Sequence, residues 1–590
     1  MTLQPAATTL TIRHLPDREP AAFQVTRADG KTAGPATPPS PVGFPVEGRP
    51  NSDLMRELQW YLETFLDYPF PPETDHADRV LDALRRWGEQ TFDALFGSRS
   101  SGRMFDAATE DAYARLHLII SSDDPRVLAW PWEALRDPEA GTLAHMCQIE
   151  RRLNKIRDAP PPPASLPKDR VNILLVIARP YQRDVRYRSI ARPLVELIGQ
   201  QKLPARVDVL RPPTFGRLRE HLRRHAGHYH ILHFDGHGGY GDHSSHHHFQ
   251  APEGRLIFEN DDGKPDPITA EQLSALLREH AVPAVVLNAC QSAMIDGGAD
   301  DPFASVAAAL LKSGMRSVVA MAYSLYVSGA QRFLPAFYGR LFEQGSVAQA
   351  VRAGRQAMLE RRGRVCSRGE YDLEDWLVPV LYQQAPFDFR FAAEAKPAFA
   401  RRESRVPEEA ARERNPYGFI GRDGPLLDLE RAMRRPPAGI LIQGLGGVGK
   451  TTLARGFVQW LDATGGLGEG CFWLPFQDIR TAEYVFNRMG EELFGGQFGA
   501  APMEEKIEAL AAVFRERRFV IVWDNFESAA GIEGTPVRAN LSEADRGLLR
   551  GFLDRLRGGA TKVILTSRSP EDWLAPERRF LLPLRGLEGE

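Results

Sequence analysis

The chain has 590 residues, of which 43% are hydrophobic, and a chain of this length and composition forms several domains with real cores. Lysine and arginine together number 74 against 77 aspartate and glutamate residues, so the formal net charge is -3. That balance leaves no basic field to attract nucleic acid, and we expect no nucleic-acid partner.

The cysteines and the amino-terminal residues indicate the cellular compartment of the protein. The four cysteines lie far apart and form no C-x-x-C pair, which argues against a disulfide framework and a structural zinc site. The first residues lack a basic patch followed by an apolar stretch, and no apolar run approaches about 18 residues. We therefore expect a cytoplasmic protein without a membrane partner.

The first stretch of the chain, residues 1–165, alternates strand and helix patterns. Strand-like alternation covers residues 9–15 and 114–122, and helical periodicity covers residues 54–70 and 77–96. A proline-rich segment closes the stretch and reads as a surface connection. We expect the later half of this α/β region to pack on the stretch that follows.

The second stretch, residues 166–392, presents a histidine and a cysteine at the ends of two apolar runs. His237 follows the run at residues 231–234, and Cys290 follows the run at residues 285–287. Both runs read as buried strands of a parallel sheet, and the helix-like segment between them completes a βαβ pattern. Because the carboxyl ends of parallel strands meet at one edge of a sheet, we expect the two side chains to meet there.

A histidine beside a cysteine is the pattern of a nucleophilic thiol, because a thiol reacts as a thiolate and a base must remove its proton. Gly238 and Gly239 leave room for a substrate backbone, and their amides, with that of Cys290, are candidates for holding an oxyanion. We therefore predict His237, Cys290 and Gly238 as catalytic residues. The alternative is an ordinary loop histidine and an ordinary buried cysteine.

Other histidines and one acid near this motif carry weaker signals. His233 and Asp235 share the strand face of His237. Asp235 is a candidate for orienting the dyad, for lining the substrate cleft or for plain buried hydrogen bonding. The four histidines within residues 243–248 lie in a polar loop without a second ligand group at a set spacing, so a solvated loop is favoured over a metal site.

The pattern around these residues resembles the CHAT domain, a caspase-like family related to caspases, metacaspases and separase. That family shows a strand ending in H-F-x-G-H-G and a later strand ending in A-C-x-S/T-A, and this chain reads HFDGHG and ACQSA over a likeness that spans about residues 116–391. The resemblance implies an α/β fold with a caspase-like, parallel-rich sheet flanked by helices, and a protein substrate. Metacaspases carry aspartate two residues before the cysteine, whereas this chain has Asn288, which leaves the residue preferred at the cleavage point open.

A charged linker is predicted at residues 393–415, and the third stretch, residues 416–590, contains a phosphate-binding loop. The sequence GLGGVGKT follows an apolar run, which gives the strand, loop and helix order of a P-loop. One later apolar run ends in Asp524, and another is followed by Arg568, which we expect at the same edge of the sheet. The alternative for Arg568 is a solvated arginine on the surface. Thr451 and Asp524 are predicted to hold Mg2+. The residues predicted to hold ATP or ADP are Gly444, Gly446, Gly447, Val448, Gly449, Lys450, Thr451, Thr452, Asp524 and Arg568.

These motifs resemble the NB-ARC module of the STAND class of signalling P-loop ATPases. In that class the arginine of the K-x-I-L-T-S-R strand senses the terminal phosphate, and the resemblance gives this role to Arg568. Asn525 stands where many members have a second aspartate, with Glu527 as a candidate replacement, so we expect slow ATP hydrolysis at most. The family continues into a helical bundle, a winged helix and a sensor array. We therefore expect an incomplete module here, with self-assembly in a longer form.

Together the two resemblances predict a caspase-like cysteine endopeptidase that an ATP/ADP-binding STAND switch regulates, in bacterial defence or death-type signalling. The alternative is a catalytically silent CHAT scaffold whose nucleotide state alone controls protein assembly. A transcription regulator is a third interpretation, but the sequence shows no helix-turn-helix signature and no basic patch.

Overall fold

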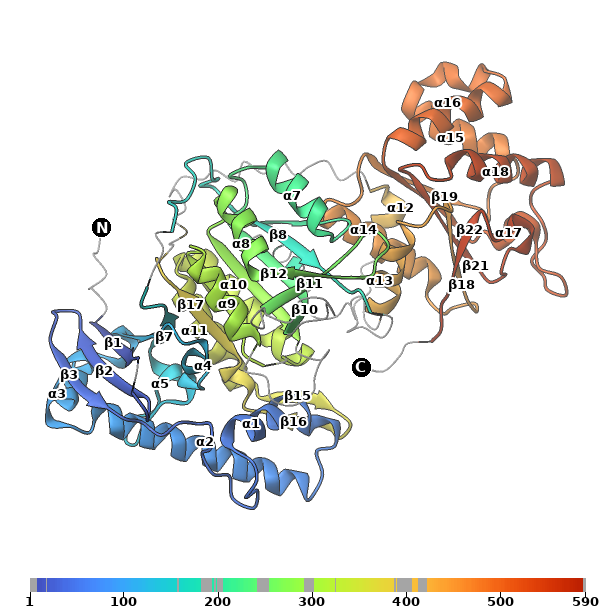
Figure 1. The fold of residues 1–590 in the computed structure, drawn as a ribbon. Helices are drawn as coiled ribbons and strands as arrows, with labels where there is room; N and C mark the ends of the chain where they lie inside the picture. Colours follow the sequence, from blue (N-terminus) through green and yellow to red (C-terminus); the bar gives the residue numbers. More distant parts are fainter. Residues whose placement is uncertain are drawn as a thin grey trace, which may run out of the picture. The chain divides into compact units, whose positions relative to one another are not determined.

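The computed structural model of the protein describes residues 8–16, 18–155, 159–181, 194–195, 198, 205–240, 254–290, 302–323, 325–386, 389, 406–411 and 422–586. These residues form two compact units (Figure 1). The first unit carries the described residues up to 389, and the second carries those from 406 onward. Each unit is built around its own sheet.

Within the described residues the first unit holds a mixed sheet of 13 strands. Its amino-terminal part has the order β7-β4-β1-β2-β3, in which β4 pairs in parallel with both β1 and β7. Apolar residues alternate along β1, so that Leu10 and Ile12 are fully buried. The strands of this part are β1 (Thr8–Leu15), β2 (Ala22–Arg27), β3 (Thr32–Ala36), β4 (Leu116–Ser121) and β7 (Gln148–Arg152).

The helices of this part begin at polar residues that cap them. The Asp53 carboxylate accepts a hydrogen bond from the amide of Arg56 at the start of α1, and the Ser98 hydroxyl accepts one from the amide of Ser101 at the start of α3. Short antiparallel strands β5 (Arg136–Asp137) and β6 (Gly141–Thr142) pair beside them. The helices are α1 (Leu54–Glu63), α2 (Glu73–Phe96), α3 (Arg99–Thr109), α4 (Pro125–Leu128) and α5 (Leu143–Met146).

The remaining strands of the sheet form its parallel core. The order β9-β8-β10-β13-β14 is parallel throughout, and β17 then pairs antiparallel with β14. The core strands are β8 (Val171–Ile177), β9 (Ala205–Val209), β10 (Ile231–Tyr240), β13 (Ala284–Cys290), β14 (Ser317–Met321) and β17 (Pro379–Gln383). The antiparallel strands β11 (Gly254–Glu259) and β12 (Pro265–Thr269) extend from the far half of β10, and β15 (Gly363–Cys366) with β16 (Gly369–Asp372) forms a separate hairpin.

Helices flank this parallel core, again with clear start and stop signals. Thr269 and Gln272 form a reciprocal capping box at the start of α8, and Gly345 ends α10 in the left-handed conformation, with φ of 73°. Helices α10 and α11 pack against each other. The helices are α7 (Phe215–Arg224), α8 (Ala270–Glu279), α9 (Pro302–Lys312), α10 (Val327–Gln344) and α11 (Val347–Glu360).

A buried ionic cluster holds the two parts of the first sheet together. In the described residues β17 and β7 share one register pair, Tyr382 with Arg151. Arg151 donates a 2.6 Å hydrogen bond to one carboxylate oxygen of Glu133, and Arg355 of α11 donates a 2.9 Å bond to the other. All three ionic side chains are at most 2% exposed. Glu133 therefore ties β7 to α11 beside a short strand pairing.

The second unit has a five-stranded parallel sheet in the order β19-β20-β21-β18-β22. Helices α15, α16 and α18 pack together (Figure 1). Their buried apolar residues belong to the same core cluster as those of the sheet. The strands are β18 (Gly439–Gln443), β19 (Gly470–Pro475), β20 (Phe519–Asp524), β21 (Lys562–Ser567) and β22 (Arg579–Pro583). The helices are α12 (Glu408–Ala411), α13 (Asp423–Ala432), α14 (Lys450–Ala463), α15 (Ala482–Phe494), α16 (Met503–Glu516), α17 (Glu527–Ala530) and α18 (Glu543–Leu556).

The predicted mixed α/β fold, with a parallel-rich sheet followed by a second parallel sheet, is confirmed. The connection between the two core strands is more elaborate than a βαβ unit, because the β11–β12 hairpin precedes α8 between β10 and β13. The predicted linker at residues 393–415 lies largely outside the described residues, and its described part carries α12.

Candidate functional site

The register of the central strands brings the two predicted catalytic positions together. Strands β10 and β13 pair in parallel from Ile231 opposite Ala284 to His237 opposite Cys290. Neighbouring strands lie about 4.8 Å apart, so the backbones of His237 and Cys290 are adjacent. Both residues lie at the carboxyl-terminal part of their strand pairing, the edge at which open α/β sheets bind ligands.

His237 lies inside the sheet and not in a loop after its strand. Strand β10 continues to Tyr240 and pairs antiparallel with β11, with His237 opposite Ile257 and Gly238 opposite Leu256. The His237 side chain is buried, and its ring meets the Tyr181 ring edge to face with the centroids 5.0 Å apart. The strand predicted from the sequence ends at residue 234. The prediction missed the second half of β10 because the glycines there interrupt the pattern of apolar residues.

A buried polar network lies directly before the His237–Cys290 pair. Asp235 and Asn288 are opposite each other in the register, and the Asn288 amide donates to Oδ1 of Asp235 across 3.2 Å. Arg179, which follows β8, donates to the same oxygen across 2.7 Å. Asp235 therefore forms an ion pair with Arg179. No sequence motif indicates this interaction, because the two residues are far apart in the chain.

The remaining histidines have other surroundings. His233 is fully buried, its Nδ1 lies 2.9 Å from the Tyr338 hydroxyl of α10, and burial lowers its pKa to about 4. It is therefore a neutral hydrogen-bonding residue within the core at neutral pH. Residues 243–248 lie outside the described residues. Among the residues that are described, no group of three or more histidine, cysteine or acidic side chains is arranged to hold a metal ion.

The P-loop of the second unit has the backbone that its glycines predict. Gly447 and Gly449 have φ of 77° and 93°, a backbone region that residues other than glycine rarely adopt. Lys450 is the first residue of α14, and its ammonium donates 3.0 Å bonds to the carbonyls of Gly444 and Leu445. Burial lowers the pKa of Lys450. The loop therefore curls around the lysine at the positive end of a helix, which is the geometry that binds phosphate.

An acid and two hydroxyls converge beside the start of α14. Asp524 ends β20, and its Oδ1 accepts hydrogen bonds of 2.8 Å from Thr451 and 2.6 Å from Thr566. A hydroxyl and a carboxylate next to a phosphate loop fit Mg2+, which takes few protein ligands and completes its shell with water and phosphate oxygens. Sequence reasoning found Thr451 and Asp524 but missed Thr566, whose only signal is its place two residues before Arg568.

Arg568 lies over the P-loop. A Cβ built on Gly446 would be 3.3 Å from Cζ of Arg568, so the guanidinium packs closely against this glycine and would have to shift slightly if the residue had a side chain. Nε of Arg568 lies 3.2 Å from Oε1 of Glu527. Arg422, which sequence reasoning did not select, is buried and donates to the carbonyl of Val448. Thr452 is exposed on α14.

A buried carboxyl group at the same edge gives the second unit a pH dependence. Glu571 accepts hydrogen bonds from Ser567 and from the Trp573 indole, and burial raises its pKa to about 7 from an ordinary value of 4.5. A carboxyl group with a raised pKa stabilises the fold below pH 4.5 and loses that contribution as the pH rises through 7.

We expect Glu571→Gln to remove this pH dependence. Between pH 4.5 and pH 8 the free energy of unfolding of the wild type should fall by about 3 kcal/mol relative to that of the variant, whose amide does not ionise. Urea denaturation at several pH values measures both. The exposed Glu533→Gln is the matched control and should keep the wild-type slope. Parallel profiles for wild type and Glu571→Gln would show that this carboxyl group does not titrate as expected.

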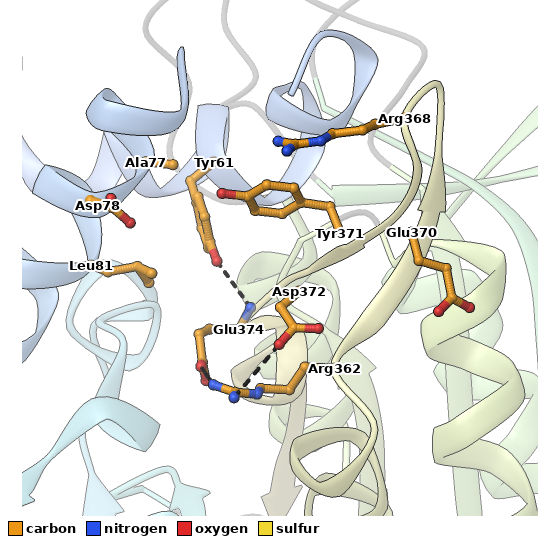
Figure 2. A pocket seen from close by; sticks show the side chains of 10 residues that line it. All are labelled: Tyr61, Ala77, Asp78, Leu81, Arg362, Arg368, Glu370, Tyr371, Asp372 and Glu374. Carbon is orange, nitrogen blue, oxygen red and sulfur yellow. Dashed lines mark hydrogen bonds and ion pairs between the residues drawn. The ribbon is translucent and has the colours of Figure 1, made fainter. Parts of the chain in front are cut away.

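A separate cavity of about 490 Å³ lies between the amino-terminal helices and the β15–β16 hairpin (Figure 2). Arg362 donates a 2.6 Å bond to Glu374, whose backbone amide donates a 3.0 Å bond to the Tyr61 hydroxyl. None of the predicted catalytic or nucleotide-binding residues lines it. The lining residues are Tyr61, Ala77, Asp78, Leu81, Arg362, Arg368, Glu370, Tyr371, Asp372 and Glu374.

The fold and the two sites define a two-part α/β protein with a candidate His–Cys edge in one unit and a P-loop in the other. The model of the CHAT domain matches residues 86–398, more than half of the chain, and the protein therefore belongs to the CHAT family. The model of the NB-ARC domain matches residues 429–530, and an NB-ARC domain implies nucleotide binding. The predicted CHAT and NB-ARC fusion is confirmed.

Solved structures give partial similarities. A STAND protein with a tetratricopeptide repeat sensor from Pyrococcus horikoshii is 18% identical over 29% of this chain and 24% of that one, with a TM-score of 0.20. The ORC2 protein of Aeropyrum pernix is 17% identical over 30% and 52% of the two chains, with a TM-score of 0.23. A separase–securin complex of Saccharomyces cerevisiae is 13% identical over 55% and 20%, with a TM-score of 0.25.

In each case the match covers less than two thirds of the other chain. No curated protein matches the chain. None of the helices in the described ranges combines the length and the apolar character needed to cross a bilayer.

Proposed function

We propose that the first unit is a cysteine endopeptidase in which His237 and Cys290 form the catalytic dyad. The observation that carries the proposal is their register, which sets the two residues opposite each other on adjacent parallel strands. Membership of the CHAT family, which is related to caspase-like peptidases, supports it. The buried Arg179–Asp235 pair stiffens the same strand two residues earlier, which favours a fixed position for the histidine.

The proposed reaction is acyl transfer to the thiol followed by hydrolysis. His237 removes the thiol proton of Cys290, and the thiolate attacks the carbonyl carbon of the scissile peptide bond. The backbone amides of Gly238 and Cys290 are the proposed donors to the oxyanion. His237 then protonates the leaving amine, and water hydrolyses the thioester with His237 again accepting a proton.

A peptide-library screen tests this proposal and requires no assumption about the cleaved sequence. Wild-type protein, with and without nucleotide, is incubated with a diverse library, and new amino termini are identified by mass spectrometry. We expect a defined set of cleavage sites that disappears in Cys290→Ala. Identical product lists for the two proteins would refute the endopeptidase and favour a catalytically silent scaffold.

We further propose that ATP or ADP bound by the second unit regulates this peptidase. The backbone amides from Gly444 to Gly449 would hold the phosphates, Lys450 would neutralise them, and Arg568 would sense the terminal one. Thr451 and Asp524 would hold Mg2+, which supplies charge neutralisation at the phosphates when bound. A peptidase joined to a nucleotide switch suits bacterial defence or death-type signalling, with self-assembly as the regulated step.

Lys450→Ala is expected to weaken ATP binding at least tenfold, because a hydrogen bond to a charged group contributes about 1.5–3 kcal/mol. Titration calorimetry with a non-hydrolysable ATP analogue measures the loss. Lys264→Ala, which removes an exposed lysine of the first unit, should bind like wild type. Equal affinities of Lys450→Ala and wild type would contradict the assignment of the phosphate site.

A further inference from the structure

A groove of about 680 Å³ lies along one face of α10 and one face of α11 in the first unit, and none of the predicted catalytic or nucleotide-binding residues lines it. The α11 positions that line it recur three and four residues apart from Gln349 to Glu360, so they share one face of the helix. On α10 the groove is lined by Ala336 and Gly339 among others, and a Cβ built on Gly339 would meet no other part of the chain within 4 Å. The two helices, which pack against each other (Figure 1), therefore leave open space at small residues of α10.

Arg352 of α11 places a half-buried positive charge in this groove. Among the described residues its guanidinium has no hydrogen bond and no ion pair, and the groups that act on its charge are Cys147 and Arg340. Burial raises the pKa of Cys147 to about 12, so this thiol stays neutral and supplies no counter-ion. Burial and the second positive charge of Arg340 lower the pKa of Arg352. A charge that is partly removed from water requires a partner, and the groove therefore attracts an anion.

Other buried arginines of the same unit show which partner is missing. Arg355, three residues later on α11, donates a 2.9 Å hydrogen bond to Glu133. Arg364 and Asp375 form an ion pair across 2.6 Å. Each of these guanidinium groups has a carboxylate from elsewhere in the chain, whereas Arg352 has none among the described residues. A carboxylate on a ligand would fill this place.

The acids at the rim of the groove are engaged elsewhere. Glu343 pairs with Arg340 across 3.2 Å, and its side chain is 68% exposed. Glu360 is exposed and accepts a 3.1 Å hydrogen bond from the side chain of Gln356. Within the part of the chain that the structure describes, the donors of Arg352 therefore remain available to a ligand.

Gln349 offers a hydrogen-bond acceptor one turn before Arg352. Its Oε1 is buried and has no hydrogen-bond partner among the described residues. Residues three apart on a helix are neighbours, so an acceptor without a donor lies beside a cation without an anion. A peptide residue that has a carboxylate close to a backbone N–H is complementary to both groups. The small residues of the groove leave room for its main chain.

We propose that this groove binds an extended peptide segment of another protein through one carboxylate and one backbone N–H. Arg352 holds the carboxylate, and Oε1 of Gln349 accepts the hydrogen bond from the N–H. The carboxylate belongs to an acidic side chain or to the free carboxyl end of the segment, which present the same chemistry to the guanidinium. The site is separate from the proposed His237–Cys290 dyad, so binding does not require cleavage.

Affinity selection from three synthetic heptapeptide mixtures tests this proposal on the full chain carrying Cys290→Ala, which prevents cleavage by the proposed dyad. The first mixture has a central glutamate and capped ends, and the second has a free carboxyl end and no acidic residue. The third has neither carboxylate. Peptides that elute with the protein in size-exclusion chromatography are identified by mass spectrometry. We expect retention from the first mixture for a side-chain carboxylate, from the second for a terminal one, and none from the third.

Arg352→Gln should weaken binding of the retained peptides at least tenfold, because it removes a charged hydrogen-bond donor. Fluorescence anisotropy with labelled copies of those peptides measures the affinities. Arg332→Gln is the matched control, since Arg332 is an exposed arginine of α10 that does not line the groove, and it should bind like the parent protein.

Gly339→Leu fills the groove instead of removing its charge. The space around Gly339 accepts a side chain, and leucine favours a helix over glycine, so the melting temperature should not fall. Peptide binding should nevertheless weaken at least tenfold, because the leucine occupies the place of the peptide. Gly216→Leu, at an exposed glycine of α7 with equally open surroundings, should leave binding unchanged.

Equal affinities of Arg352→Gln and its parent would overturn the proposal. So would a parent protein that retains no peptide with a carboxylate, or one that retains the third mixture as well as the others. Undiminished binding by Gly339→Leu would place the peptide elsewhere and would also overturn it. Because every protein in the comparison carries Cys290→Ala, none of these outcomes depends on whether the first unit is a peptidase.

Discussion

Cys290→Ala is expected to reduce peptide hydrolysis roughly 10⁶-fold, and His237→Ala is expected to reduce it by a similar factor. The thiolate is the nucleophile and the imidazole is its base, so neither residue works without the other. For the same reason the double variant should be no slower than either single variant. Initial rates on a peptide identified by the library screen measure all three.

Cys366→Ala is the matched control for these variants. Cys366 is a partly exposed cysteine in the β15–β16 hairpin, outside the central strands, and its removal should leave the rate unchanged. Nucleotide affinity should also be unchanged in each catalytic variant, because the P-loop belongs to the other unit. Substantial hydrolysis by Cys290→Ala, or a double variant much slower than the single ones, would argue against a dyad.

Glu133→Ala should lower the free energy of unfolding of the first unit by about 3–5 kcal/mol, because it leaves two buried arginines without their shared partner. The expected loss is large since both Arg151 and Arg355 are almost completely buried. Urea denaturation measures it, and hydrogen exchange of the β7 peptide assigns the transition to this unit.

Glu343→Ala is the surface counterpart of this change. Glu343 pairs with Arg340 on α10, its side chain is 68% exposed, and the loss should stay below about 1 kcal/mol. If Glu133→Ala and Glu343→Ala lowered the free energy of unfolding by similar amounts, the buried cluster would not be what holds β7 to α11. A selective loss would instead show that the short β17–β7 pairing depends on this cluster.

The parts of the molecule that sequence predicts well are local. The P-loop spans eight consecutive residues, and its glycines, lysine and threonine have the backbone and contacts that their spacing implies. The His237–Cys290 register follows from two apolar runs that pair in parallel with the same offset. In both cases the information lies within a strand and the few residues after it.

The parts that sequence did not predict depend on pairing between distant residues. Arg355 and Glu133 are 222 positions apart, and Arg179 and Asp235 are 56 apart, so no local pattern links them. The second half of β10 is rich in glycine, and tertiary pairing with β11 makes it a strand in spite of its composition. Thr566 has an ordinary place in an apolar strand, and only the parallel sheet brings it to Asp524.

The central claim is that His237 activates Cys290, and site-resolved alkylation tests it most directly. Wild type and His237→Ala are treated briefly with limiting iodoacetamide near neutral pH, and labelled cysteines are quantified by peptide mapping. Burial raises the pKa of Cys147 to about 12 and also raises that of Cys471, so both should stay unlabelled. We predict that Cys290 is labelled much faster than the partly exposed Cys366, and that this advantage is lost in His237→Ala. Preferential labelling of Cys366, or equal labelling of Cys290 in both proteins, would contradict the dyad.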